Sequence, residues 1–159
     1  MDIEKYFKKR LISRITETEL QRYTNFFENS YKENLEHGKH NLEIFPRWSI
    51  ISGYYAMHDI TKLFLAKKFM LKIDYNVHKT TISILKEIIK DKVILKMLKI
   101  GYKEFIEIAN DLARSRKTRT KAQYYTGSEF MKEKYKEKAK EFIEKIVIPY
   151  IAKIEDLIK

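Results

Sequence analysis

Apolar side chains recur every three or four positions along most of the chain, and this period limits the possible folds more than any other feature. Such a period places apolar side chains on one face of an α-helix, whereas a half-buried strand needs strict alternation, which is scarce here. Only two prolines and four glycines interrupt the 159 residues. The sequence therefore predicts an all-α protein, and this length suits a single domain covering residues 1–159.

Start and stop signals divide the chain into helices. Thr16 followed by Glu19 is typical of a capping box, as is Thr126 followed by Glu129. The expected helices cover residues 3–13, 16–36, 47–70, 77–89 and 102 onward into a basic segment, and a long last helix begins after a break at 124–129. A loop is expected at 37–46, a turn at 72–76 and a short apolar piece at 91–98.

Two helices carry further signals. The helix at 47–70, which begins after Pro46, is apolar on most of its sides, and such a helix is usually surrounded by others. We therefore expect it at the centre of a bundle. Pro149 should kink the last helix, because its ring meets the carbonyl of Lys145 and it donates no amide hydrogen.

The charge balance indicates the sign of a partner. The chain has 33 Lys and Arg residues against 22 Asp and Glu, a net charge of +11, which favours anionic partners such as nucleic acid or nucleotides. It has no cysteine, which excludes disulfides, thiolate zinc sites and a cysteine nucleophile and favours a cytoplasmic location. The sequence shows no leader and no membrane-spanning run, so no membrane partner is expected.

The strongest candidate site is the basic segment at residues 111–125, which has five cations and, after Asp111, no acid. The apolar stripe of the preceding helix continues to Arg116, so this guanidinium should face the bundle, where Asp59 could pair with it. Aromatic rings beside cations can stack on bases while phosphates are neutralised. The predicted binding residues are Arg114, Arg116, Lys117, Arg119, Lys121, Tyr124 and Tyr125. Alternatively, these cations only complement the dipole at a helix end.

The four histidines suggest no metal site, and no cofactor is expected. His37 and His40 lie near acids in a predicted loop without a second pair of ligands, so a surface loop is favoured over a metal site. His58 and Asp59 are adjacent on a helix and should diverge by ~100°, which argues against an acid–base pair. His78 should cap a helix or pack in the core.

Two stretches of the sequence resemble the HEPN family of small helical domains, over residues 48–150. The first holds Tyr54-Tyr55-Ala56-Met57 in one helix, with His78-Lys79 opening the next. The second begins with Ala113-Arg114-Ser115-Arg116 and is followed by Ala122-x-Tyr124. The resemblance implies an up-and-down bundle of four to five main helices, which is often a homodimer. It also implies a possible toxin–antitoxin pair with a nucleotidyltransferase partner.

Ribonuclease members of that family carry Arg-x(4–6)-His, and this sequence departs from the pattern. From Arg119, the positions for histidine hold Tyr124, Tyr125 and Thr126, and no histidine follows His78. A phenol of pKa ~10 is a poor base near neutrality. We therefore expect a non-catalytic module that binds RNA or a nucleotide. A dimeric adaptor that docks a nucleotidyltransferase, and a ribonuclease without the usual motif that uses His58 or His78, remain as alternatives.

Overall fold

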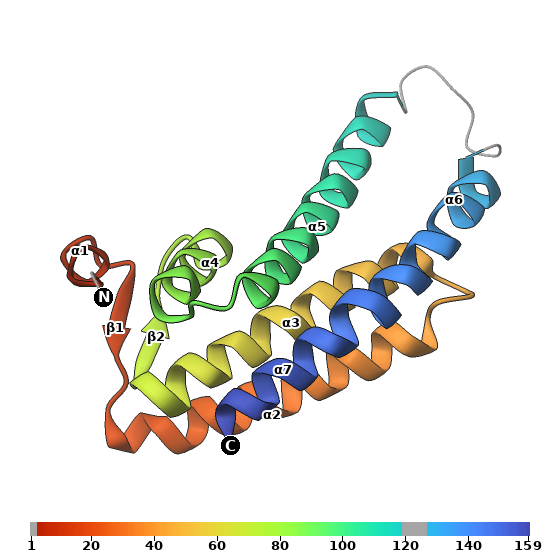
Figure 1. Cartoon of the computed structure of the whole chain (residues 1–159). Helices are drawn as coiled ribbons and strands as arrows, with labels where there is room; N and C mark the ends of the chain where they lie inside the picture. Colours follow the sequence, from red (N-terminus) through yellow and green to blue (C-terminus); the bar gives the residue numbers. More distant parts are fainter. Residues whose placement is uncertain (1–2, 119–126) are drawn as a thin grey trace.

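The protein is almost entirely helical, as expected (Figure 1). The computed structural model describes residues 3–118 and 127–159, with side chains for all of these except 111–132 and 134. The helices are α1 (Glu4–Lys8), α2 (Glu17–His40), α3 (Pro46–Phe69), α4 (Val77–Ile88), α5 (Lys92–Thr118), α6 (Gly127–Phe142) and α7 (Ile148–Ile158), with a π-helical turn η1 (Ile143–Val147) between the last two. Strands β1 (Ile12–Arg14) and β2 (Leu71–Ile73) complete the described part.

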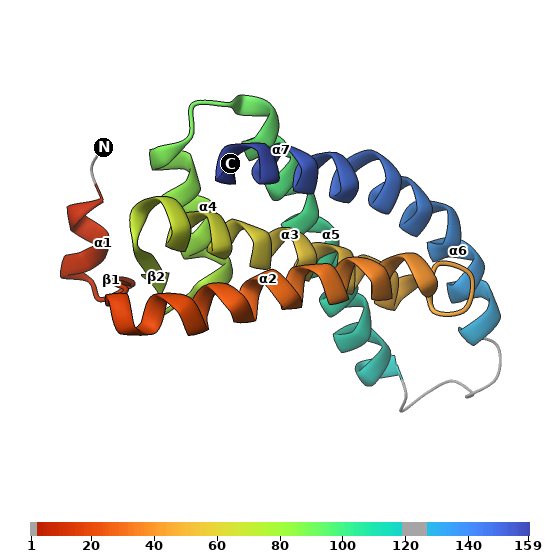
Figure 2. The same cartoon turned by 90° about the horizontal axis from the view of Figure 1, so that it is seen from below.

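Helix α3 is the central helix, as predicted from its apolar surface. It packs against α2, α4, α5, α6, η1 and α7; α2 and α5 lie on different sides of it in Figure 1, and α5 crosses it in Figure 2. Its side chains Ile50, Tyr54, Met57, Ile60 and Leu65 are fully or almost fully buried. The C-terminal turns of α5 diverge from α3 in both views. The core therefore surrounds α3, and one end of α5 lies at its edge.

The small sheet was not predicted. The first helix was expected to reach residue 13, but α1 ends at Lys8 and β1 follows, pairing antiparallel with β2 in the register Ile12↔Ile73 and Arg14↔Leu71. The predicted turn at 72–76 therefore begins with a strand. Each strand has three residues, too few to show an alternating pattern in the sequence. The pairing fastens the N-terminal segment to the link between α3 and α4.

Two helices continue through glycines where the sequence predicted a loop at 37–46 and a new helix from 102. Helix α2 runs through Gly38 to His40, so the predicted loop at 37–46 shrinks to its second half, and α5 runs unbroken through Gly101. A Cβ at Gly38 would lie 3.1 Å from Ile143 Cδ1 and 3.3 Å from Ser49 O. This glycine permits close helix packing instead of ending a helix.

The first predicted capping box and the two prolines each correspond to a feature of the structure. Glu19 accepts from the Thr16 backbone amide at 3.3 Å, which confirms that capping box, and Pro46 occupies the first turn of α3. Ahead of Pro149 the last helix widens into η1. A π-turn is one way for a helix to accommodate a missing amide donor. The Thr126–Glu129 capping box lies outside the described residues and side chains.

Candidate functional site

The predicted basic segment lies mainly beyond what the structure describes. Arg114, Arg116 and Lys117 belong to the last turns of α5, but their side chains are not described. The remaining predicted binding residues, Arg119, Lys121, Tyr124 and Tyr125, lie outside the described residues. The structure therefore places three of the seven backbone positions on one helix.

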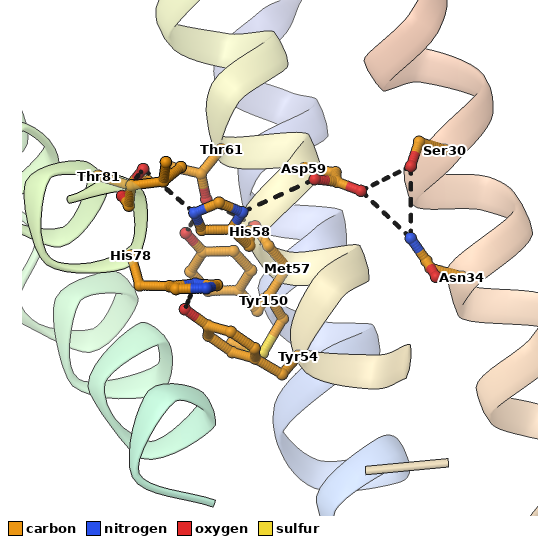
Figure 3. Close-up of polar contacts among 11 residues, drawn as sticks. Ser30, Asn34, Tyr54, Met57, His58, Asp59, Thr61, His78, Thr81 and Tyr150 are labelled. Carbon is orange, nitrogen blue, oxygen red and sulfur yellow. Dashed lines mark hydrogen bonds and ion pairs between the residues drawn. The ribbon is translucent and has the colours of Figure 1, made fainter. Parts of the chain in front are cut away.

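Asp59, the proposed partner of Arg116, is buried at the α2–α3 contact. Its Oδ2 accepts hydrogen bonds from Ser30 Oγ at 2.7 Å and Asn34 Nδ2 at 3.2 Å (Figure 3). The other oxygen, Oδ1, lies 3.7 Å from His58 Nδ1. Asp59 thus has two neutral hydrogen-bond donors of its own on α2, and its pairing with Arg116 stays a prediction.

A second cluster of positive charge, separate from the basic segment, lies between α4 and α5. Two adjoining hollows of about 580 Å³ and 480 Å³ share Lys99 and Lys103 and continue along both helices. Seven lysines, all exposed, line them: Lys79, Lys86, Lys90, Lys92, Lys96, Lys99 and Lys103. We call these two hollows together the lysine groove.

Helical spacing explains why these lysines face one another. On α5 the lysines stand at 92, 96, 99 and 103, a spacing of four, three and four residues that keeps them on one helix face. Across the groove, Lys79 and Lys86 of α4 are seven residues apart with Ser83 between them, and Lys90 follows in the link to α5. Each helix therefore presents a row of ammonium groups toward the same hollow.

Few carboxylates neutralise this surface. Between residues 79 and 103 the only acids are Glu87 and Asp91. Glu87 pairs with Lys5 at 3.2 Å, and Asp91 Oδ1 caps α5 by accepting from the Val93 amide at 2.7 Å. Both of these acids are therefore already engaged, and a third acid, Glu107, also lines the groove.

Only one groove lysine has a carboxylate within 4.0 Å among the described side chains. Lys103 lies 3.7 Å from Glu107, and Glu107 is held more closely by Lys138 of α6, at 2.8 Å. The hydrogen bond from Lys138 holds the pKa of Glu107 below its usual value. The other lysine charges of the groove are left to solvent and ions, which suits a surface that attracts anions.

The floor of the lysine groove is apolar. Half-buried side chains lie beneath the lysines in both hollows: Ile82, Leu95, Ile100, Tyr102 and Ile106. The Tyr102 ring lies 6.0 Å from the His78 ring at an interplanar angle of 24°, so packing on α4 restrains it. The groove combines a hydrocarbon base with cationic walls.

Behind the floor, two histidines join α4 to α3. His78 was predicted to cap a helix or pack in the core, and its Nδ1 lies 2.8 Å from the Tyr54 hydroxyl (Figure 3). Burial raises the pKa of Tyr54, so this hydroxyl keeps its proton in the hydrogen bond with His78 Nδ1. Burial also lowers the pKa of His78. Neutral His78 is therefore a core partner of Tyr54, as predicted.

The state of His58 follows from its contact with Thr81. Thr81 Oγ1 donates its one proton to Val77 O at 2.7 Å, so His58 Nε2, 3.3 Å away, must be the donor to that hydroxyl oxygen. His58 Nδ1 has no hydrogen-bond partner among the described residues, and burial lowers the pKa of the ring. His58 Nδ1 lies 3.7 Å from Asp59 Oδ1, which is too far for a hydrogen bond. The two side chains are nevertheless closer to each other than we expected for adjacent residues on a helix.

The remaining histidines belong to α2 instead of a loop. His37 Nδ1 lies 2.7 Å from Ser52 Oγ, and His40 Nδ1 lies 2.8 Å from Glu36 O. In the part of the chain that the structure describes, no group of three His, Cys, Asp or Glu side chains is arranged to hold a metal. Within that same part, no helix combines the length and the apolar character that crossing a membrane requires.

The lysine groove was missed because its residues are divided between two helices. Each lysine row alone is typical of a solvated helix face, and only the packing of α4 against α5 joins them. The available signal was seven lysines against two acids between residues 79 and 103. Searches with the whole chain found no matching family model, curated protein or solved structure.

Proposed function

We propose that this protein is a non-catalytic HEPN-like module that binds RNA or nucleotides through the lysine groove and the basic end of α5. The observation that carries the proposal is the pair of lysine rows on α4 and α5, in which Lys103 alone has a carboxylate neighbour among the described side chains. Phosphates neutralise such charges and release bound counterions, which favours binding at low salt.

Helix geometry supports a link between the groove and the predicted basic segment. Arg114 follows Lys103 by eleven residues, which is about three turns of an α-helix, and Lys117 follows by fourteen, about four turns. Their backbone positions on α5 therefore lie on the side that carries the lysine row. Residues 103 and 114 are separated by about 17 Å along the helix, so an extended phosphate backbone could contact both regions.

Binding to a labelled single-stranded RNA across a salt series tests this function. We expect affinity to fall steeply with salt, by about 0.7 logarithmic units per logarithmic unit of salt for each phosphate contact. In the variant Lys96→Gln/Lys99→Gln/Lys103→Gln, which removes three such contacts, the slope of log affinity against log salt should become shallower by about 2. Salt-independent binding, or a slope unchanged in the variant, contradicts the proposal.

A matched control removes three lysines from other surfaces. Lys32, Lys39 and Lys145 are exposed and pair with Glu28, Glu36 and Glu141 on their own helices. The triple glutamine variant at these positions loses the same charge as the groove variant. It should bind RNA with nearly the affinity and salt slope of the unchanged protein, because the surface it alters lies outside the groove.

A second candidate function, docking of a nucleotidyltransferase, is favoured by an exposed apolar patch. Ile44, Phe45 and Trp48, at the α2–α3 turn, are 58%, 55% and 56% exposed. Exposed apolar groups gathered in one place are typical of protein contacts. An adjacent nucleotidyltransferase gene and co-purification of its product would support docking. Phe45→Ser/Trp48→Ser should then abolish co-purification and leave RNA affinity unchanged.

A further inference from the structure

We infer that the lysine groove selects single-stranded nucleic acid, with unpaired bases against its apolar floor and phosphates along its two lysine rows. The inference rests on the proposed function, since it specifies which anion the groove accepts. It uses the floor, whereas the function itself requires only the cations.

The floor distinguishes between anions of equal charge. Ile82, Leu95 and Ile106 are half-buried and face the hollows, where a polar polyanion would leave them against water. An unpaired base has flat apolar faces that can cover such side chains and stack on an aromatic ring such as Tyr102. A ligand with both phosphates and unpaired bases therefore matches the groove more completely than phosphate alone.

Duplex nucleic acid can contact only the lysines of the groove and not its apolar floor. Its bases are stacked and paired inside the helix, so it presents phosphates and sugars to a protein surface of this kind. A duplex could contact the lysines, yet it could not cover the floor with base faces. We therefore expect both forms to be attracted by charge, and the single strand to bind more tightly.

The extent of the lysine rows favours a strand over a single nucleotide. The row on α5 begins at Lys92 and reaches Lys103, eleven residues or about 17 Å along the helix. The opposite row covers a similar number of residues, from Lys79 to Lys90. One nucleotide can occupy only part of this length, whereas successive phosphates of a strand can contact lysines throughout it.

The experiment compares four ligands with the full chain at one salt concentration. They are a 12-nucleotide single-stranded RNA, the same sequence as a duplex, adenosine monophosphate and inorganic polyphosphate. We expect the single strand to bind at least about fivefold more tightly than the duplex, and about a hundredfold more tightly than the mononucleotide. Equal affinity for single strand and duplex, or tight binding of the mononucleotide, overturns the inference.

Variants of the floor separate base contact from charge. Leu95→Gln/Ile106→Gln keeps every lysine, and should weaken single-strand binding about tenfold while leaving polyphosphate binding unchanged. Val93→Gln/Ile148→Gln is the matched control, because both side chains are exposed, at 52% and 40%, and neither lines the groove. Tyr102→Leu, which keeps apolar volume but removes the flat ring, provides a second floor variant and should weaken single-strand binding about threefold.

The outcomes distinguish this inference from the proposed function. If single strand, duplex and polyphosphate bind alike and with steep salt dependence, and the floor variants have no effect, the groove binds polyanions but does not select single strands. If none of the four ligands binds in a salt-dependent way, the proposed function itself is wrong. Circular dichroism of each variant establishes that a lost affinity does not reflect a lost fold.

Discussion

At the scale of single residues, the contact between Tyr54 and His78 connects the core to the wall of the lysine groove. Tyr54 is fully buried on α3, stacks on Phe105 with ring centroids 4.8 Å apart and forms a hydrogen bond with His78 on α4. His78 in turn precedes Lys79, the first lysine of the α4 row. The position of that row therefore depends on a hydrogen bond made in the interior.

Removing the Tyr54 hydroxyl should destabilise the protein by a modest amount. Tyr54→Phe keeps the ring and its packing but leaves half-buried His78 Nδ1 without its hydrogen-bond partner, a loss of about 1 kcal/mol in the free energy of unfolding. Urea denaturation measures it. Tyr102→Phe is the control, because the Tyr102 hydroxyl has no hydrogen-bond partner among the described residues, and its stability should change little. Equal effects of the two substitutions contradict the role given to Tyr54.

The two histidines also make stability depend on pH. Burial holds the pKa values of His58 and His78 below the ordinary value of 6.5, so the unfolded chain binds protons that the folded chain does not. The free energy of unfolding should therefore fall as pH decreases from above 6.5 toward the lower folded pKa values, and then level off with respect to these groups. Carboxylates with lowered pKa values affect the free energy of unfolding at more acidic pH than the histidines do.

Urea titrations at pH 7.5 and 5.5 measure this dependence. His58→Gln/His78→Gln should be less stable than the unchanged protein at pH 7.5, because it loses both native hydrogen bonds, but its stability should vary less between the two pH values. His40→Gln is the control, since His40 lies exposed at the end of α2. A pH dependence that survives the double substitution would contradict the assignment.

At the scale of elements, the close contact of α3 with the π-turn η1 requires a glycine. A Cβ at Gly53 would lie 2.7 Å from Ile143 Cδ1 and 3.0 Å from Val147 Cγ2, and both side chains are buried. Valine at this position overpacks the contact between α3 and η1. Gly53→Val should lower the free energy of unfolding by about 2 kcal/mol or more, measured by chemical denaturation.

An exposed position separates packing from helix propensity. Ala152 of α7 is exposed, and Ala152→Val introduces the same β-branched side chain into a helix without a core contact. Ala152→Val should lower the free energy of unfolding by about 0.5 kcal/mol. If Gly53→Val cost no more than Ala152→Val, the close approach of α3 to η1 would not matter for stability.

The elements show which parts of the fold were predictable from the sequence. Helix α3 and the start of α2 were predictable, because each combines an apolar pattern with a proline or a capping box, and α4 was predictable from its apolar pattern. Gly38 and Gly101 were read as local breaks although their roles depend on partners distant in the sequence. The strands β1 and β2 have no local signal strong enough at three residues each.

The candidate site, like the fold, has some features that the sequence predicted and others that it did not. Basic character was recognised at residues 114–121, where five cations fall within eight positions, but not in the rows of α4 and α5, where the lysines are three to seven residues apart. His78 was expected to have a core partner and has one in Tyr54. Its proximity to His58, with ring centroids 4.9 Å apart, could not be predicted because it depends on how α4 docks on α3.

At the scale of the whole molecule, two distinct regions of the described surface are available to partners. The lysine groove lies between α4 and α5, and the apolar patch of Ile44, Phe45 and Trp48 lies at the α2–α3 turn. One region attracts anions and the other favours apolar contact. A ligand at one of them need not prevent a partner from binding the other.

The single tryptophan reports on the apolar patch. Trp48 is 56% exposed, so its fluorescence in the free protein should be quenched by acrylamide almost as strongly as in the urea-unfolded chain. RNA bound in the lysine groove should leave the quenching unchanged, whereas a protein docked on the patch should reduce it. Weak quenching in the free monomer would show that the side chain is covered.

The most direct test of the account is to map bound RNA by the amide chemical shifts of isotope-labelled protein. Titration with a 12-nucleotide single strand should shift amides of α4 and of the first half of α5, where the lysines and the apolar floor lie, and leave those of α2 nearly unchanged. Saturable shifts on α2 or α7, with α4 and α5 unaffected, would contradict the claim that the lysine groove is the binding surface.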